Sequence, residues 1–125
     1  MKPLGLGVDI VEIARLTLAI ERQGQAFLDR CFLPAEQEYC NAHREPARSY
    51  AARFAAKEAV AKALGTGFGA QLGWCDVEVR RKASGEPFII LHGTGAETAE
   101  RLGITTLLVS LSHSEHYAVA NAIAT

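Results

Sequence analysis

Residues 53–69 read RFAAKEAVAKALGTGFG, an alanine-rich run that ends in three glycines within five residues. Alanine has the highest intrinsic helix propensity, and glycine is the usual residue just past a helix end. The alanine-rich composition extends upstream to Pro46, so that residues 47–64 contain eight alanines. We therefore expect the longest helix of the chain over residues 47–64, closed by Gly65.

The charges on this helix have two interpretations. Residues four apart share a helix face, so Glu58 lies beside Lys62, and Arg53 beside Lys57. The structural interpretation is a solvated face with ion pairs that each contribute about 0.3 kcal/mol. The functional interpretation is a phosphate site, in which the glycine loop exposes backbone N–H groups and Lys62 offsets the repulsion from the helix C-terminal dipole. The helix alone favours the solvated face, and a glycine cap explains the loop equally well.

Further helices and strands are expected on both sides of this helix. Alternation of β-branched residues predicts a strand at residues 4–12, and helical spacing predicts a helix at 13–22 that stops at Gly24. Pro34 begins a short helix within residues 32–42. Downstream we expect a hairpin, a short helix and two strands, at 74–82 with 87–93, 96–103, 104–114 and 116–124. Helices mainly in the first half and strands in the second predict an α+β fold with an antiparallel sheet.

The composition is that of a single globular domain, residues 1–125. Apolar residues make up 49% and charged residues 22%, with a net charge of -1, which argues against disorder and against nucleic-acid binding. Asp9 and Glu12 interrupt the apolar N-terminal stretch, so it predicts neither a signal peptide nor a membrane span, and we expect a cytoplasmic protein. The cysteines show no metal-ligand spacing and are expected to be reduced and packed as small apolar side chains: Cys31, Cys40 and Cys75.

Asp9 is a carboxylate in a strand that is otherwise almost wholly apolar. Such a group needs a cation, a set of hydrogen-bond donors or a metal as its partner. Together with Glu58 it would form an all-oxygen, two-carboxylate site that suits Mg²⁺. The alternative is that Asp9 caps the helix that follows the strand. The spacing does not decide between the two.

Residues 110–116, SLSHSEH, end an apolar strand with a cluster of polar side chains. His113, flanked by Ser112 and Ser114, could bind phosphate or shuttle a proton. On its own the segment is more typical of a polar turn between two strands. The GxSxG pattern of many serine hydrolases is missing from the sequence, so that class is not favoured.

Four segments in this order resemble a known family. They are GLGVDIVEIARL at 5–16, RFAAKEAVAKALGTGFG at 53–69, DVEVRRKASGEPFI at 76–89 and VSLSHSEHYAVANAIA at 109–124. Together they resemble the holo-[acyl-carrier-protein] synthases, the short bacterial type of 4'-phosphopantetheinyl transferase, over essentially the whole chain. The resemblance implies that family's fold, with an antiparallel sheet against a long central helix and shorter helices. It also implies Mg²⁺-dependent transfer of 4'-phosphopantetheine from coenzyme A to a serine of apo-acyl carrier protein, which releases adenosine 3',5'-bisphosphate.

The resemblance also implies a role for individual residues. By the family pattern, Asp9 and Glu58 hold the metal, and Glu58 and Lys62 are catalytic, with Lys62 at the pyrophosphate. Either Glu58 or a water on Mg²⁺ would accept the serine proton. The positions implied to bind coenzyme A are Arg44, Arg48, Arg53, Gly65, Thr66, Gly67, Ser112 and His113. Those implied to bind the acidic carrier protein are Arg15 and Arg22.

The sequence departs from the family in two places, and the family implies an assembly. The segment HREPAR at 43–48, where the family holds the 3'-phosphate, carries a proline and a glutamate. Leu33 and Pro34 replace a hydroxyl cap, so that proline starts the next helix.

The family forms homotrimers with shared sites, and its members support fatty acid biosynthesis. Alternatives are activation of polyketide carrier proteins, another Mg²⁺-dependent phosphate-ester enzyme, or a module that binds without turnover.

Overall fold

The computed structural model describes residues 2–125 and has an α+β fold, as expected. The helices are α1 (Ile13–Gln23), α2 (Gln25–Cys31), α3 (Pro34–Asn41), α4 (Pro46–Leu64) and α5 (Gly93–Arg101), with a 3₁₀ turn, η1, at Trp74–Asp76. The strands are β1 (Gly5–Glu12), β2 (Val77–Arg81), β3 (Pro87–Leu91), β4 (Leu107–His113) and β5 (Tyr117–Ala124). No helix within the described residues is long and apolar enough to cross a membrane.

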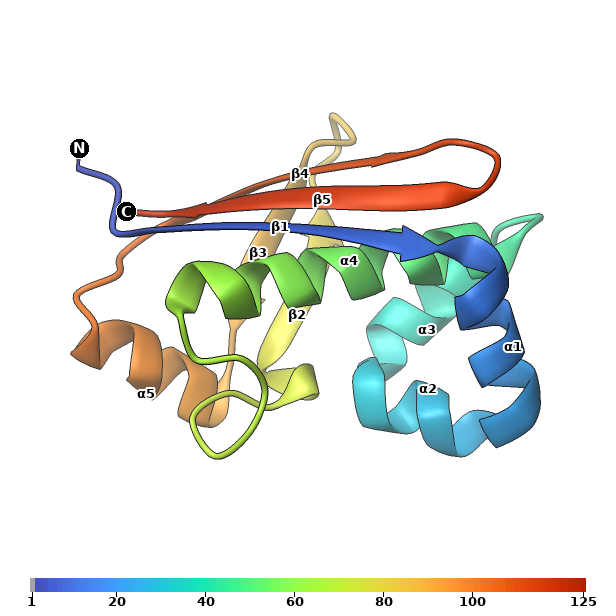
Figure 1. Cartoon of the computed structure of the whole chain (residues 1–125), viewed down its shortest axis with the longest axis horizontal. Helices are drawn as coiled ribbons and strands as arrows, with labels where there is room; N and C mark the ends of the chain where they lie inside the picture. The colour runs from blue at the N-terminus through green and yellow to red at the C-terminus, as the bar shows by residue number, and fades with distance from the viewer. Residues whose placement is uncertain (1) are drawn as a thin grey trace.

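The strands form two antiparallel sheets, and α4 lies against the larger one. That sheet has the order β1-β5-β4, and β2 pairs with β3 in a separate hairpin. Figure 1 shows α4 running along one face of the three-stranded sheet, with α1, α2 and α3 gathered at one end and α5 at the other. In the register, Asp9 lies opposite Ala120, which in turn lies opposite Leu111.

The contact between β1 and α4 is made by backbone rather than by side chains. A Cβ atom at Gly5 would lie 1.8 Å from the carbonyl oxygen of Ala63, and one at Gly7 would lie 1.9 Å from that of Ala59. The four alanines of β5 that face α4 are fully buried. Small residues on both surfaces therefore allow the helix and the sheet to approach closely. This approach places Asp9, on β1, beside the charged residues of α4.

A buried ion pair joins α3 to the opposite side of α4. Lys57 is 0% exposed, and its Nζ lies 2.7 Å from Oε1 of Glu36 and 3.1 Å from the carbonyl oxygen of Trp74. The other carboxylate oxygen of Glu36 accepts a hydrogen bond from the Val79 N–H. Arg53 is only 2% exposed. The prediction of a solvated face for Arg53 and Lys57 was therefore wrong, because α3 and β2 cover that side of the helix.

Two other elements differ from the expectation. Gly24 ends α1 as predicted, with a φ of 63°, but the chain continues at once into the seven-residue α2. A helix this short gives too few repeats for its periodicity to be recognised. Residues 74–76, expected as strand, form the 3₁₀ turn instead. Pro34 starts α3 as predicted, and Glu36 accepts a hydrogen bond from the Leu33 N–H at 2.9 Å.

The cysteines are packed as expected. All three are free, and Cys31 and Cys40 are buried. Burial raises the pKa of the Cys40 thiol to about 11, and burial is also the main cause of the raised pKa of Cys31 and of Cys75. A thiol with a raised pKa carries little thiolate at neutral pH and is a poor nucleophile. The cysteines are therefore structural residues.

Candidate active site

The partner of Asp9 is Lys62. The Lys62 ammonium donates to Oδ1 of Asp9 at 3.0 Å and to the Val8 carbonyl oxygen at 2.9 Å. Lys62 therefore pairs across to β1, instead of forming the intrahelical pair with Glu58 that the solvated-face interpretation required. The capping interpretation of Asp9 was also wrong, because the N-cap of α1 is Glu12 and no side chain caps that helix.

Glu58 lies in the same groove as Asp9, on the surface of α4 that faces β1 and α1. Burial raises the pKa of the Glu58 carboxyl, the charge of Asp9 raises it further, and Lys62 lowers it. The groove has a volume of about 320 Å³, and its lining includes Asp9, Glu58, Arg15, Phe27 and Phe54. Three carboxylates, those of Asp9, Glu12 and Glu58, therefore line an open groove with an apolar wall. Arg15 is also in the lining, and Lys62 is joined to the groove through its pair with Asp9.

The pair of carboxylates fits a magnesium ion better than it fits zinc. Within residues 2–125 no group of three or more His, Cys, Asp and Glu side chains is placed to hold a metal. Magnesium is commonly bound by one or two carboxylates, with the remaining positions taken by water and substrate phosphates. Burial and then the charge of Asp9 raise the pKa of Glu58, and a cation bound between the two carboxylates would favour their charged forms. Asp9 and Glu58 are therefore suited to a hard cation.

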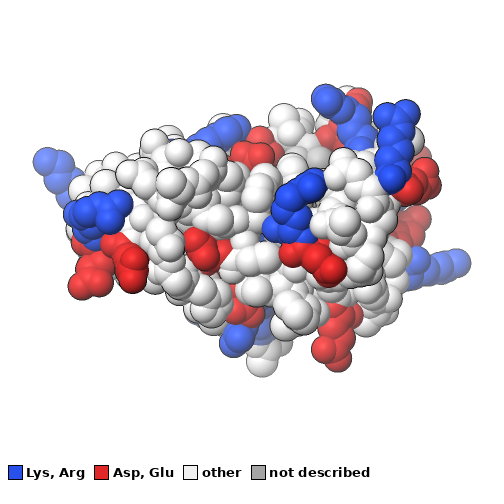
Figure 2. Space-filling model, turned by 90° about the horizontal axis from the view of Figure 1, so that it is seen from below, with Lys and Arg blue, Asp and Glu red and all other residues white. Residues whose placement is uncertain are grey.

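One of the two arginines expected at the carrier protein belongs to this groove. Arg15 lines it directly, and Arg22 is exposed in the last turn of α1. Positions seven apart lie on one face of a helix, so both arginines can meet the same partner. Figure 2 shows acidic and basic side chains interspersed over the face seen from below. Attraction of an acidic protein would therefore depend on local arginines rather than on the total charge.

Phe27 and Phe54 line the groove but were not predicted as site residues from the sequence motifs. Both rings line the groove with Asp9 and Glu58. A signal for Phe54 was present, because it precedes Glu58 by four residues and so shares its helix face. Phe27 lies on α2, which was not predicted, and so it carried no such signal.

The glycine loop differs from the phosphate-binding arrangement considered for it. Gly65 has a φ of 77° and caps α4 in the left-handed conformation, as expected. The N–H groups of Thr66 and Gly67 both donate to the Ala61 carbonyl oxygen at 3.3 Å. These amides are therefore committed to the helix end, so the hypothesis of free donors beside Lys62 is wrong for them. A Cβ at Gly65 or Gly67 would meet no atom within 4 Å, so there is open space at both positions.

Ser112 and His113 are not brought to the groove within one chain. Ser112 lies opposite Val119, which lies opposite Ile10, so Ser112 is two strands, roughly 10 Å, from β1. Paired residues point to the same side of a sheet, so Ser112 is on the outer face with Ile10, whereas Asp9 faces α4. The polar turn expected here is present, with the Ser114 N–H bonded to the Tyr117 carbonyl oxygen at 2.8 Å.

The remaining predicted arginines lie around the N-terminal half of α4. Arg44 is exposed, and Arg48 pairs with Glu45 at 3.1 Å. The guanidinium of Arg53 stacks over the Tyr39 ring at 3.9 Å, and its buried Nε has no hydrogen-bond partner among the described residues. Arg53 lines a separate pocket of about 230 Å³. The structure thus does not place these arginines beside Glu58.

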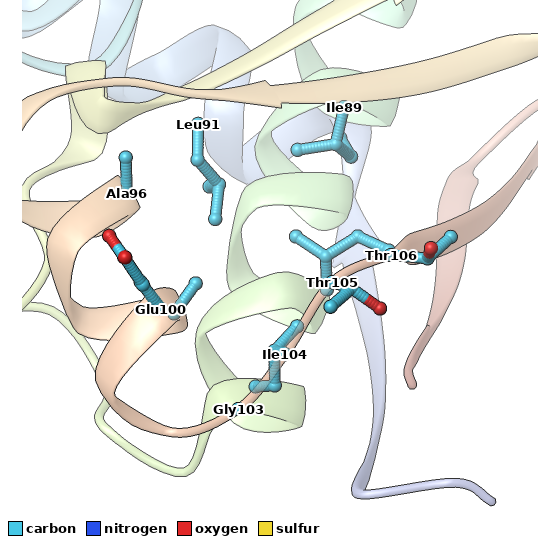
Figure 3. A pocket seen from close by; sticks show the side chains of 10 residues that line it. Ile89, Leu91, Ala96, Glu100, Gly103, Ile104, Thr105 and Thr106 are labelled. Carbon is cyan, nitrogen blue, oxygen red and sulfur yellow. The ribbon is translucent and has the colours of Figure 1, made fainter.

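A further concavity lies apart from the predicted site. It has a volume of about 320 Å³ and is enclosed by β3, α5 and the segment that leads into β4. Figure 3 shows the apolar side chains of Ile89, Leu91 and Ile104 around it, with Glu100, Thr105 and Thr106 also in its lining. Nothing in its chemistry connects it with the groove at Asp9.

This fold, with its groove of carboxylates and lysine, defines the class of protein. The sequence model of the 4'-phosphopantetheinyl transferase superfamily matches residues 5–122. The holo-[acyl-carrier-protein] synthase of Desulforudis audaxviator is 52% identical over 121 residues, covering 97% of this chain and 92% of that protein. That of Koribacter versatilis is 46% identical over 120 residues, covering 96% of both chains.

Solved structures agree with the sequence relatives. The holo-[acyl-carrier-protein] synthase of Neisseria meningitidis superposes with a TM-score of 0.93 at 31% identity, covering 99% of both chains. That of Helicobacter pylori, in complex with coenzyme A, superposes with a TM-score of 0.86 at 32% identity, covering 96% of this chain and 99% of that one. The chain belongs to the holo-[acyl-carrier-protein] synthase family of enzymes, which confirms the resemblance in its sequence.

Proposed function

We propose that the protein transfers 4'-phosphopantetheine from coenzyme A to a serine hydroxyl of apo-acyl carrier protein, with Mg²⁺ as cofactor. The observation that carries this proposal is that Glu58 and Asp9, which is paired with Lys62, lie together at one open groove. Such a groove can neutralise a pyrophosphate, and charge neutralisation with correct positioning provides most of the catalysis in phosphoryl transfer. The product released is adenosine 3',5'-bisphosphate.

Asp9 and Glu58 are the residues that we assign to the magnesium ion. When bound, the ion would neutralise the charge of the pyrophosphate and of the departing phosphate. Lys62 now holds Asp9, so its ammonium already occupies the part of the groove where positive charge is needed. We assign Lys62 to the pyrophosphate oxygens, where it stabilises the negative charge that develops on the leaving group.

The reaction forms one bond and breaks one. The serine oxygen of the carrier protein bonds to the phosphorus that bears the pantetheine arm. The bond from that phosphorus to the bridging oxygen breaks, and the electron pair leaves with adenosine 3',5'-bisphosphate. Glu58 is the residue of this chain that we assign to accept the serine proton, because its carboxylate lines the groove in which the transfer would take place.

Coenzyme A would extend from this groove toward the arginines and the glycine loop. The space at Gly65, Thr66 and Gly67 would admit its backbone. The guanidinium of Arg53 is buried and has an Nε without an acceptor, so an anion would relieve the cost of its burial. We assign the 3'-phosphate to this arginine together with Arg44 and Arg48. A molecule as long as coenzyme A is needed to join places that lie on different faces of α4.

Three copies of the chain would share these sites. The outer face of the larger sheet carries Leu6, Val8, Ile10 and Leu108, all exposed, with Leu6 at 73%. An apolar sheet face of this kind is typical of a subunit interface. Ser112 lies on the same outer face, so it could reach the phosphates of coenzyme A only in the site of a neighbouring copy. We assign His113, at the end of the same strand, to that site as well. We therefore propose a homotrimer.

A charge placed on the outer face should dissociate the assembly. We expect Leu6→Glu to be folded by circular dichroism, to be monomeric by analytical ultracentrifugation and to lose most of its transfer activity, because the shared site is incomplete. Leu102→Glu, which changes an exposed leucine at the end of α5, is the control and should remain a trimer. A wild-type monomer with full activity would contradict the proposal.

Reversing one charge should separate the two substrates. We expect Arg15→Glu to raise the Michaelis constant for the carrier protein by about tenfold, because charge complementarity steers an acidic partner to its site. The constant for coenzyme A should change less than twofold. Steady-state kinetics at low and high salt provide the measurement, and the effect should shrink as salt screens the charges. Arg101→Glu, on α5, is the control, and an equal effect there would contradict the assignment.

Mass spectrometry tests the activity itself. Incubation with coenzyme A, Mg²⁺ and an apo-carrier should add the mass of the phosphopantetheine arm to the carrier. Binding of coenzyme A without this gain would indicate a module without turnover, and hydrolysis of other phosphate esters would indicate a different enzyme. Parallel reactions with fatty-acid and polyketide carriers test our proposal that the protein serves fatty acid biosynthesis in the cytoplasm.

A further inference from the structure

Four aromatic rings form a continuous column beside the groove. Phe68 stacks on Trp74 with 3.8 Å between ring centroids and 11° between planes. Trp74 stacks on Phe54 at 4.7 Å and 25°, and Phe54 on Phe27 at 6.2 Å and 23°. The column thus begins in the glycine loop, with Phe68, and ends in the wall of the groove.

The part of the column that Trp74 and Phe54 form is held by the core. The backbone of Trp74 is fixed because its carbonyl oxygen accepts a hydrogen bond from the buried ammonium of Lys57. Glu36 in turn fixes Lys57 at 2.7 Å. Phe54 belongs to α4, one turn before Glu58. The position of the Trp74 ring is therefore determined by elements that do not belong to the loop.

The loop itself is attached at its two ends. Residues 65–67 are held at the end of α4. Gln71 is held by a 2.7 Å hydrogen bond from the Thr98 hydroxyl, and Gly69 pairs with Leu72 in a short bridge. Between these attachments, the side chain of Phe68 is the part of the loop that touches the column. Glycine on both sides of Phe68 would permit other backbone conformations, and the ring contact adds a restraint to the hydrogen bonds of Gly67 and Gly69.

We propose that Phe68 is a positioning residue: its stacking on Trp74 holds the glycine loop in the conformation that leaves open the space into which coenzyme A binds. The inference rests on the proposed function, because it concerns how that substrate is admitted. It assigns no chemical role to Phe68. Trp74 provides the fixed ring, between α4 and the loop, on which Phe68 stacks.

Loss of the stack should lower the fraction of molecules whose loop is in the binding conformation. The apparent dissociation constant rises in inverse proportion to that fraction. Aromatic pairs shift such equilibria by roughly two- to tenfold beyond the effect of buried area. We therefore expect Phe68→Ala to weaken binding of coenzyme A by at most about tenfold, with little effect on the carrier protein.

The test compares wild type with Phe68→Ala, Phe68→Leu and Phe68→Tyr. Calorimetric titration with coenzyme A, without carrier, should show weaker binding, by up to about tenfold, for the alanine variant, intermediate binding for leucine and near wild-type binding for tyrosine, which keeps the stack. Hydrogen exchange should rise in residues 65–73 of Phe68→Ala and stay unchanged in α4. The chain has one tryptophan, so the emission of Trp74 reports directly on whether its ring is covered.

The outcomes separate this inference from the proposed function. A wild-type protein that does not bind coenzyme A overturns the proposed function and this inference with it. Wild-type affinity in Phe68→Ala, with Trp74 emission shifted, overturns the inference alone. An equal loss of thermal stability in Phe68→Ala and Phe68→Tyr, without the difference in affinity, would show a merely structural role. Leu102→Ala on the surface of α5 is the matched control and should change none of these measurements.

Discussion

Glu58→Gln is expected to abolish transfer and to make the protein slightly more stable. Glutamine keeps the size of the side chain but removes both the charge that we assign to the metal and the proposed proton acceptor. General-base catalysis alone contributes about 10² to 10⁴ in rate, and loss of the metal site would add to this. The fall in kcat should therefore be at least about a thousandfold, measured by transfer to an apo-carrier at saturating substrate and Mg²⁺.

The rise in stability follows from the pKa of Glu58. Burial and Asp9 raise that pKa in the folded protein, so the folded state binds the proton more tightly than the unfolded state does. The ionised form is therefore destabilising above the folded pKa, and this penalty disappears below the unfolded pKa. A neutral glutamine removes the penalty, so the melting temperature should exceed that of wild type at neutral pH and match it at acid pH.

Two further variants complete this test. Asp9→Asn should also collapse Mg²⁺-dependent transfer, because it removes the other carboxylate and the partner of Lys62. Glu97→Gln, on the exposed side of α5, is the control and should retain activity and melting temperature. Full activity in Glu58→Gln or in Asp9→Asn would exclude the metal assignment, whatever the effect on stability.

Gly7→Ala is expected to produce a large loss of stability, although it adds only a single methyl group. The new Cβ would lie 1.9 Å from the Ala59 carbonyl oxygen, which belongs to the backbone of α4 and cannot rotate away. Either β1 must move away from α4 or the whole sheet must shift. In both cases the β5 alanines lose their burial against α4. The cost should exceed about 4 kcal/mol, at the extreme end of point substitutions.

Chemical denaturation of Gly7→Ala and Gly69→Ala provides a matched comparison. A Cβ at Gly69 would meet nothing within 4 Å, and its φ is outside the positive range, so this variant should lie within about 0.5 kcal/mol of wild type. If Gly7→Ala does not fold, its recovery in inclusion bodies beside a soluble Gly69→Ala gives the same answer. A soluble Gly7→Ala of wild-type stability would show that the two backbones do not touch in solution.

Local signals were sufficient to predict most of the elements. The alanines before Gly65 and the alternation in β1 and β5 each specify a helix or a strand through their own composition. Helix α2 was missed because seven residues after a glycine show no repeat. The burial of Lys57 could not be predicted either, since Glu36, which satisfies it, is 21 residues away along the chain. Pairing between distant elements decides whether a charge on a helix is solvated.

The candidate site could be predicted only in part, again because its contacts join elements that are distant along the chain. The residue types at positions Asp9, Glu58 and Lys62 suggested a phosphate site. Only the contact between β1 and α4 shows that Lys62 forms its ion pair with Asp9. Helical spacing favoured the pair Glu58 and Lys62 instead. The commitment of the loop amides to the helix end depends on the cap geometry at Gly65, which composition does not reveal.

The strand pairing has a consequence for how the protein is made. β1 begins at Gly5, yet its only partner in the sheet of the described chain is β5, which ends at Ala124. During synthesis the first strand must therefore wait, unpaired, until almost the whole chain has left the ribosome. Until then only the contact of this strand with α4 can hold Asp9 in place. We expect nascent chains that stop before residue 117 to have a less stable groove than the complete sheet provides.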